Sequence, residues 1–562
     1  AETATVTVGT LRPKIASIAI GAKIALTATV DEIKASKIEF PTALTAATGI
    51  AGSQFTVKKP TGTNEIAVET VAVADGKLSL SWVVNDPKLT LTTSGNWSTA
   101  DARWTNLTEA TAPIAGNVIV NFGAGTTPLT LTIDTASVNL DTLTLMGSAN
   151  ATHKVVLSHP VNVKTLELLG NVELQTPMSS DFTVANGVNA TTIGLGNFTL
   201  KKSGEGALNL SHTTVVKGTL EVVAGSIACT SVTLGAANSV VTLKMSGEGT
   251  FTSTNALTLG GETFFKSEKS GGSTIACAIT NPQRLAKSGS QDLTLAGSIS
   301  GDGKLDVVAG KLILTAANSR PNENSVNGTT TIATGATLDL STPGAKLCTA
   351  RNSSPMTVNG TLIVHTFGYE GSLGTLSIDT AAMFTVNGGT VEIRSSGDNG
   401  SRPITIGANG GTVFVPASYA PIISGAITNN GGFTKAGVGT LTQAGAMSGD
   451  GALTVAEGTL KLTAQNTRTG WTTSESPTNG ATTIASGATL DILSSTGRLY
   501  TNGGATGVKV NITVNGTLKL RQYGWKEDSL GHYADGSNFT VAGGSLETTE
   551  VWSTNGIINC GA

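Results

Sequence analysis

Five aspartates are the first residues to consider for chemistry, because glycoside hydrolysis needs two carboxylates facing one cleft and lyase chemistry needs a stabilised carboxylate with an Arg or Lys base. They are Asp302, Asp306, Asp339, Asp450 and Asp491. Asp302 and Asp450 lie in Ser-Gly-Asp-Gly turns, where Asp is a common turn former. Asp339 and Asp491 are the polar members of alternating strands. Since these four recur as two duplicated pairs, we expect structural roles for them and predict neither a catalytic residue nor an enzyme.

Histidines and cysteines are the usual metal ligands, and their spacing here does not fit a metal site. The five histidines are His153, His159, His212, His365 and His532, and the sequence contains neither His-x-x-x-His nor Cys-x-x-Cys. Zinc is therefore not expected. Glycine-rich segments such as 407–411 do not open helices, so they do not form a phosphate cradle. We expect no metal and no cofactor.

Aromatic residues are scarce and grouped, which makes them candidates for contact with sugars or partner chains. The segments His365–Glu370 and Arg521–Lys526 are related by an offset of 156 and concentrate aromatic side chains twice. The alternative is that these rings are hydrophobic plugs over the open side of a coil. The candidate contact or assembly residues are Phe367, Tyr369, Tyr523, Trp525, Trp97 and Trp104, of which the last two mark the entry to the repeat region.

The four cysteines are too few to form a disulfide framework. Cys229 and Cys277 are about two solenoid coils apart in the sequence. Two coils place Cα atoms roughly 9–10 Å apart, which exceeds the ~7 Å that a disulfide tolerates. Cys348 and Cys560 have no cysteine counterpart in the duplicated segment and are candidates for an interchain link. Four reduced thiols are the alternative.

The composition narrows the classes of partner. Of 562 residues only 13% are charged, the net charge is −3, and no basic cluster extends beyond two lysines, so a nucleic-acid partner is not expected. The sequence contains no apolar run long enough to predict a membrane span. Hydrophobic residues make up 39%, Gly is abundant and Thr alternates with apolar residues, which predicts a folded, almost wholly β chain. The first residues, Ala-Glu-Thr-Ala, favour an exported protein after signal cleavage, secreted or at the cell surface.

Two regions differ in rhythm. Residues 1–88 contain short alternating runs at roughly 10-residue spacing, typical of a small antiparallel, Ig-like sandwich that acts as a cap or assembly domain. Residues 89–562 contain internal repeats. Lys287–Gly297 matches Lys435–Gly445 at an offset of 148, and 330–340 matches 482–492 at 152. The duplicated blocks lie near 287–393 and 435–548.

Short alternating strands separated by Gly or Asn-Gly turns favour a β-solenoid, in which each coil contacts only its neighbours. We predict a right-handed parallel β-helix of about 20 coils for residues 89–562. In such a stack Val, Ile and Leu form inner rows, Gly occupies corners and Thr lies outside.

The later blocks resemble a known family of repeats. Each has Lys-x-Gly, a Leu-containing strand, a Gly-x-Gly turn, a Gly-x-Leu-x-Leu strand and then an Asn, and Gly95–Trp104 resembles the opening of such proteins. The resemblance is to exported proteins with autotransporter-associated β-strand repeats, over about residues 89–562. It implies a β-helical passenger from a Gram-negative bacterium, often adhesive or structural. The sequence shows no segment like the outer-membrane barrel that ends self-secreting members.

Together these features predict a non-enzymatic structural subunit of an extracellular fibre or sheath. We expect it to assemble with itself, head to tail, through the solenoid ends and the amino-terminal domain. The alternatives are a surface adhesin that binds a glycan or another protein, and a carbohydrate-active β-helix enzyme.

Overall fold

The computed structural model describes most of the chain. The described residues are 5–9, 23–27, 37–39, 55–58, 66–74, 77–84, 87–98, 104–105, 113–185, 191–320, 328–349, 355–368, 371–374, 384–468, 480–500, 511–523, 529–530, 538–551 and 558–561. The chain divides into two compact units, unit 1 (Ala1–Glu173) and unit 2 (Leu174–Ala562). Every strand or helix element in the described residues is a β-strand, which confirms the all-β prediction.

The first strands of unit 1 form two small sheets. One contains β1 (Thr5–Gly9), β2 (Lys23–Thr27) and β4 (Phe55–Lys58), and the other contains β3 (Lys37–Ile38), β6 (Lys77–Val84) and β5 (Ile66–Ala74). The second sheet is antiparallel, as expected, but the first is parallel. A very short connection joins β5 to β6, which suits a hairpin, whereas the connections between the parallel strands are long enough for crossovers. The sandwich arrangement of residues 1–88 stays a prediction.

The solenoid begins in unit 1. Its first sheet contains β7 (Lys88–Thr90), β9 (Trp104–Thr105), β10 (Ala115–Asn121), β12 (Val138–Met146) and β14 (Val161–Leu169), and its second contains β8 (Gly95–Asn96), β11 (Thr130–Ile133), β13 (Thr152–Leu157) and β15 (Asn171–Gln175), of which the last ends in unit 2. Strands β10, β12 and β14 pair in parallel, whereas β7 pairs antiparallel with β9. The coil strands thus start directly after residue 87.

Unit 2 contains three columns of parallel strands, named here columns 1 to 3. Column 1 consists of β18 (Thr199–Ser203), β21 (Gly218–Val222), β24 (Val240–Met245), β27 (Glu262–Ser267), β30 (Arg284–Ser288), β33 (Lys304–Val307), β35 (Thr330–Ile332), β37 (Met356–Val358), β39 (Phe384–Val386), β42 (Ile404–Ile406), β45 (Ile427–Asn429), β48 (Met447–Gly449) and β51 (Thr467–Arg468).

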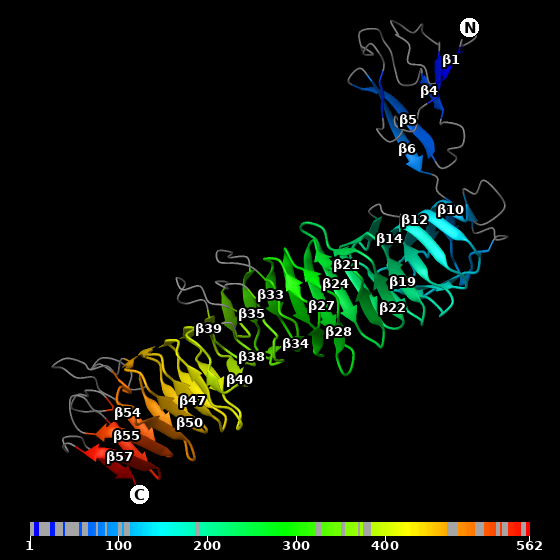
Figure 1. The fold of residues 1–562 in the computed structure, drawn as a ribbon. Helices are drawn as coiled ribbons and strands as arrows, with labels where there is room; N and C mark the ends of the chain where they lie inside the picture. Colours follow the sequence, from blue (N-terminus) through cyan, green and yellow to red (C-terminus); the bar gives the residue numbers. More distant parts are fainter. Residues whose placement is uncertain are drawn as a thin grey trace. The chain divides into compact units, whose positions relative to one another are not determined.

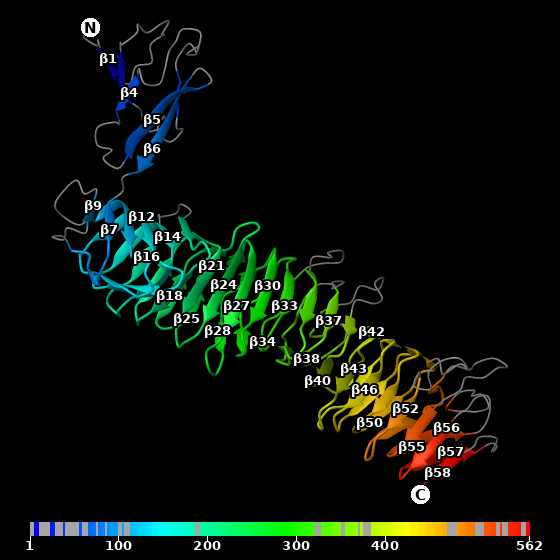
Figure 2. The same cartoon turned by 180° about the vertical axis from the view of Figure 1, so that it is seen from behind.

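Column 2 consists of β16 (Phe182–Val184), β19 (Ala207–Leu210), β22 (Ser226–Cys229), β25 (Thr250–Ser253), β28 (Ser273–Ile275), β31 (Leu293–Leu295), β34 (Lys311–Leu314), β36 (Thr337–Leu340), β38 (Thr361–Val364), β40 (Thr390–Ile393), β43 (Gly411–Phe414), β46 (Phe433–Ala436), β49 (Leu453–Val455), β52 (Thr482–Ile484), β54 (Asn511–Val514), β56 (Asn538–Ala542) and β58 (Ile558–Gly561). Figure 1 shows many of these strands stacked in chain order, and Figure 2 shows the same stack from behind.

Column 3 consists of β17 (Thr191–Gly194), β20 (Thr213–Val216), β23 (Val232–Leu234), β26 (Leu257–Leu259), β29 (Ile279–Thr280) and β32 (Ile299–Ser300), and then of β41 (Gly397–Asp398), β44 (Pro421–Ile423), β47 (Thr440–Gln443), β50 (Thr459–Leu462), β53 (Thr489–Ile492), β55 (Thr517–Tyr523) and β57 (Ser545–Val551). Between β32 and β41 isolated bridges such as Ala317 to Lys346 continue it.

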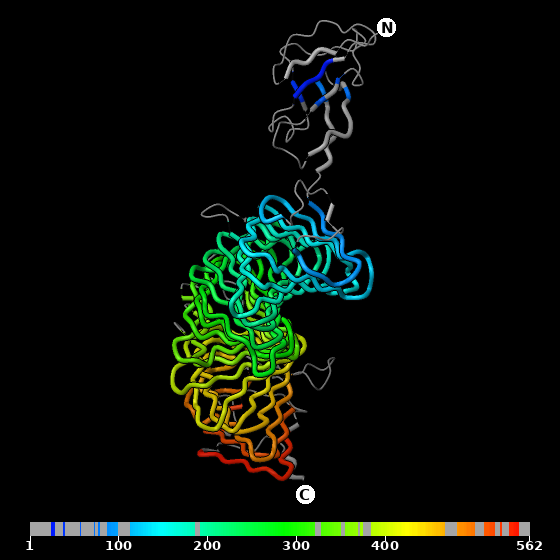
Figure 3. Tube along the Cα trace, turned by 90° about the vertical axis from the view of Figure 1, so that its right-hand side faces the viewer, coloured from blue at the N-terminus to red at the C-terminus, as the bar shows by residue number. Residues whose placement is uncertain are grey.

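The parallel β-solenoid predicted from the sequence is confirmed. Column 2 alone steps through about 16 coils in unit 2. Strands β10, β12 and β14 belong to further coils in unit 1, so the number is close to the expected 20, although coil lengths vary. One coil runs from Thr337 to its register partner Thr361, and the next, which is longer, runs from Thr361 to Thr390. The tube in Figure 3 follows successive coils of unit 2.

Inward side chains form the core as rows along the stack. In column 3 the row Leu441, Leu460, Leu490 and Leu518 runs through four successive strands, and each of these side chains is fully buried. Alternation along each strand therefore places one residue in such a row and the next outside, as the sequence pattern predicts.

The duplicated blocks occupy different faces of the stack. Six steps within column 1 lead from β30 to β45 through β33, β35, β37, β39 and β42, and β46 follows in column 2. Lys287 on β30 therefore lies in column 1, whereas its repeat counterpart Lys435 on β46 lies in column 2. The two blocks are related by six coils and one further strand.

Corner glycines are required where two coils approach closely. Gly449 has φ 96°, and a Cβ on it would lie 2.2 Å from Asn429 O. Gly487 also has a positive φ of 77°, but a Cβ there would meet nothing within 4 Å. The pair separates the conformational role of a corner glycine from its role in close packing.

We expect Gly449→Ala to destabilise the protein by about 2 kcal/mol more than Gly487→Ala, because an added methyl group in a closely packed corner forces the backbone to shift. Both substitutions place a side chain in the left-handed region, at about 1–2 kcal/mol, but only the first forces two backbones apart. Urea unfolding monitored by circular dichroism measures the difference, and equal losses would contradict a packing role for Gly449.

Candidate functional site

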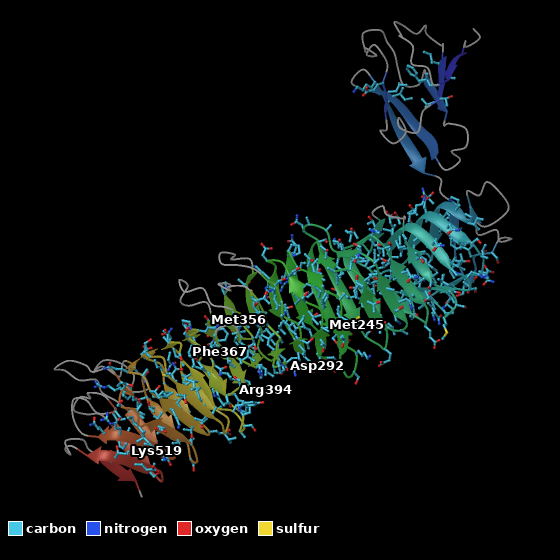
Figure 4. The ribbon with its side chains drawn as sticks, in the orientation of Figure 1. Met245, Asp292, Met356, Phe367, Arg394 and Lys519 are labelled. Carbon is cyan, nitrogen blue, oxygen red and sulfur yellow. The ribbon has the colours of Figure 1, made fainter. Side chains whose placement is uncertain are left out.

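Phe367, a predicted contact residue, lies inside unit 2. Its side chain, labelled in Figure 4, is fully buried. It meets the Phe384 ring edge-on at 5.1 Å between centroids. Its main-chain N–H donates to Asn399 Oδ1 at 2.8 Å. This placement favours the hydrophobic-plug interpretation of Phe367 over direct contact with a partner.

Of the other aromatic candidates, one is a buried tryptophan and two lie on strands. The Trp97 indole is fully buried in unit 1, and its Nε1 donates to Pro113 O at 3.1 Å. Trp104 lies on β9, where it pairs with Leu89, and Tyr523 ends β55, but the description covers only the backbone of both. Tyr369 and Trp525 lie outside the described residues, so the contact role predicted for them stays a prediction.

The two aromatic segments have similar bases. Ser372 N–H donates to Thr366 O at 2.9 Å, and Ser529 N–H donates to Gln522 O at 3.1 Å. Each serine Oγ also accepts from the same partner's main-chain N–H, at 3.3 Å in both cases. Thr366 and Gln522 are related by the same offset of 156 that was found in the sequence. The duplication thus extends to the hydrogen bonds that close the segments.

The cysteines whose side chains are described form no disulfide, as the spacing predicts for Cys229 and Cys277. Cys229 pairs in register with Ser253 on β25, and β25 pairs with β28, which precedes Cys277. The two cysteines are therefore two coils apart, with Ser253 on the coil between them. Burial raises the pKa of each. Cys348 is buried, and its Sγ donates to Arg320 O. Cys560 lies on β58 with only its backbone described, so an interchain link stays a prediction.

Cys348 belongs to a buried polar corner that differs between the two blocks. Arg320 Nη1 donates to Thr330 Oγ1 at 2.9 Å in the first block. In the second block Tyr500 Oη bonds to Thr482 Oγ1 at 2.8 Å. Thr330 and Thr482 are repeat counterparts at offset 152, as are Cys348 and Tyr500. A tyrosine hydroxyl therefore bonds to this threonine in the second block, whereas an arginine guanidinium bonds to its counterpart in the first.

Three of the candidate aspartates form ion pairs on the outer faces. The pairs are Arg284 Nε with Asp306 Oδ2 at 2.5 Å, Lys311 Nζ with Asp339 Oδ2 at 2.8 Å, and Lys461 Nζ with Asp491 Oδ2 at 3.8 Å. Burial would raise the pKa of Asp339, but hydrogen bonds from Lys311 and Ser341 hold it below its ordinary value. Each carboxylate thus pairs with a cation on the neighbouring strand and links the two strands.

Three lysines are buried and structural, which the sequence analysis did not predict. Lys202 on β18, Lys287 on β30 and Lys435 on β46 occupy inward positions and are fully buried. Each ammonium donates to main-chain carbonyls in its own corner and in the corner one coil away. Burial lowers the pKa of each to about 8, while a nearby carboxylate raises it. The signal was a lysine in the apolar phase of an alternating strand, two residues before glycine.

Lys435 shows how such a cation fits an apolar row. It stands in register between Val413 and Val455, the inward residues of the neighbouring coils. Its Nζ donates to Gly437 O at 2.6 Å and to Glu457 O at 2.9 Å. Its bonded partners are main-chain carbonyls. The ammonium therefore stabilises the corner.

We expect Lys435→Met to destabilise unit 2 by about 1–3 kcal/mol, because buried carbonyls lose their donor. The matched control is Lys461→Met, whose side chain is 47% exposed and whose loss is expected to stay below about 1 kcal/mol. Urea unfolding of both variants measures the difference. A neutral effect at Lys435 would contradict its role at the corner.

His153 is a buried titratable group in unit 1. Its side chain is fully buried and stacks on Phe122 at 4.7 Å between centroids. Nδ1 accepts from the Leu129 N–H at 3.2 Å, while Nε2 has no hydrogen-bond partner in the described structure. Burial lowers the pKa of His153 below 6.5. Protonation would place a charge in the core and remove the acceptor for Leu129.

We expect acid to weaken unit 1 through His153. The folded-state pKa lies below the unfolded value, so below pH 6.5 the unfolded chain takes up the proton first. Stability then falls until pH reaches the folded pKa, by about 1.4 kcal/mol for each unit of pKa difference. Urea unfolding followed by tryptophan fluorescence at pH 7.5 and pH 5 measures the loss. His153→Gln should reduce the loss, whereas exposed His159→Gln should leave it unchanged; equal behaviour would contradict the prediction.

The described residues show no arrangement typical of a metal centre or a membrane span. No three His, Cys, Asp or Glu side chains among them gather into a possible metal site. No helix of membrane-spanning length and apolarity occurs in the same ranges. No protein-family model, curated protein or solved structure matches this chain. Any functional conclusion therefore depends on the residues themselves.

Proposed function

We propose that this chain is a non-enzymatic structural subunit of an extracellular or cell-surface fibre or sheath. It assembles with itself through the ends of a right-handed solenoid and through a sandwich-like domain of residues 1–88. The proposal includes kinship with exported proteins that carry autotransporter-associated β-strand repeats, which is supported by the repeated residues quoted above.

This proposal rests on what the polar side chains bond to. The buried lysines bond to corner carbonyls, and three of the candidate aspartates bond to cations on neighbouring strands. A catalytic carboxylate pair or a nucleophile with its base would instead aim side chains at a shared reacting position. The chemistry described here is directed at joining coils, which favours a mechanical role.

We place the contact between copies at strand β57. Among the described residues it pairs on one side, with β55. Leu546 continues the inward row of Leu518 but is partly exposed, whereas Leu518 is fully buried. Beside it the register row Lys461, Asp491, Lys519 and Glu547 alternates in charge. A strand from a second copy could cover Leu546 and extend both rows.

We expect the native chain to form concentration-dependent multimers that Leu546→Lys disperses, because a charge on an open strand edge opposes strand addition. Light scattering after size-exclusion chromatography and negative-stain micrographs measure assembly. The control is Leu493→Lys, at a leucine already 40% exposed, which should leave assembly intact. Dispersed monomers of the native chain across concentration and salt would contradict the proposal.

A further inference from the structure

Column 2 carries an unbroken outer row of threonines. The row consists of Thr337, Thr361, Thr390, Thr412, Thr434, Thr454, Thr483, Thr513 and Thr540, which are register partners on successive coils. Each side chain is partly exposed. Successive hydroxyls therefore follow the rung spacing of about 4.8 Å along one flat face.

These hydroxyls are not used inside the chain. Within the described ranges none of the nine donates or accepts a side-chain hydrogen bond, unlike Thr482 Oγ1, which bonds to Tyr500. A row of free hydroxyls can donate and accept at each rung. The row thus offers the same polar contact nine times in one direction.

The face is also uncharged over its last six threonines. Strands β43, β46, β49, β52, β54 and β56 contain one charged residue, Lys435, and its side chain is buried inside. Column 3 differs, because its outer row includes Lys461, Asp491, Lys519 and Glu547. A neutral row favours an uncharged partner, since a charged polymer would gain nothing from it and would lose hydration.

One partly exposed aromatic ring lies beside this row. Phe414 is two residues after Thr412 on the same outer side of β43, and its register partner on the next coil is the small Ala436. The Phe414 Cε2 would lie 3.1 Å from a Cβ on Gly437, so this glycine lets the ring lie close to the backbone. Aromatic rings present an apolar surface to the faces of sugars.

We infer that the last six threonines of the column 2 row, together with Phe414, bind an extended neutral polysaccharide lying along the stack. Two rungs span about 9.6 Å, a length comparable to the repeat of an extended β-linked disaccharide. Alternate threonines can then meet equivalent sugar hydroxyls, and weak single contacts add along the chain. The inference does not depend on self-assembly, because one copy carries the whole row.

The test measures binding of the full chain to insoluble cellulose, chitin and β-1,3-glucan, with polygalacturonate as the charged comparison. We expect retention on at least one neutral polymer and none on polygalacturonate. The triple variant Thr434→Val, Thr454→Val, Thr483→Val keeps side-chain shape but removes three hydroxyls, and should weaken binding at least tenfold. Phe414→Ala should weaken it severalfold.

The matched control is Thr459→Val, Thr489→Val, Thr517→Val, which removes three hydroxyls from column 3 and should leave binding unchanged. Thermal melting confirms that both triple variants are folded. Binding to no neutral polymer, binding to polygalacturonate alone, or equal losses in the two triples would overturn the inference. Repeating the assay on Leu546→Lys separates glycan binding from assembly, since binding should persist in dispersed copies.

Discussion

Main-chain carbonyls at the corners are the constraint on which the rest of the stack depends. Along each strand the neighbouring coils satisfy the backbone, but at a corner the chain changes direction and some carbonyls turn inward, away from water. A buried carbonyl without a donor is costly. This chain supplies donors from side chains: Gln443 Nε2 bonds to Gly425 O at 2.7 Å and Gly445 O at 2.8 Å, much as the buried lysines do elsewhere.

Asparagines extend the same solution to both donors and acceptors. Asn318 Oδ1 accepts from the Ile299 N–H at 2.7 Å while its Nδ2 donates to Lys346 O at 2.6 Å, so one side chain joins three successive coils. Asn466 makes the equivalent bond to the Met447 N–H. With the corners held from inside, the outer faces need few charges for stability. The low charged fraction of the composition is consistent with this internal bonding.

Much of the architecture follows from local pattern. Alternation with a period of two places one side chain in a row and the next outside, and this holds for almost every short strand, so the parallel solenoid could be predicted. The length of each coil could not be predicted, because corner length is not encoded in alternation. The parallel pairing of β1, β2 and β4 could not be foreseen either, since strand direction depends on the connections.

The candidate residues show the limit of single-position reasoning. Phe367 stood out because aromatics are rare, yet rarity does not distinguish a plug from a contact, and its ring is buried against Phe384. The threonine row was the opposite case: each residue is ordinary alone, and its regularity appears only when the register between coils is known. Lys435 needed the same information, because its neighbours in space are Val413 and Val455.

Because the duplicated blocks are displaced by one face, strands that correspond in the repeat lie in different columns. Thr337 corresponds in the repeat to Thr489, yet Thr489 lies in column 3, while the threonine row of column 2 continues through Thr483, which corresponds to Thr331 in column 1. A continuous face is thus composed of strands that are not copies of one another. Any strand of this type can occupy any side, so such a protein can lengthen by fractional coils without interrupting the surface it presents.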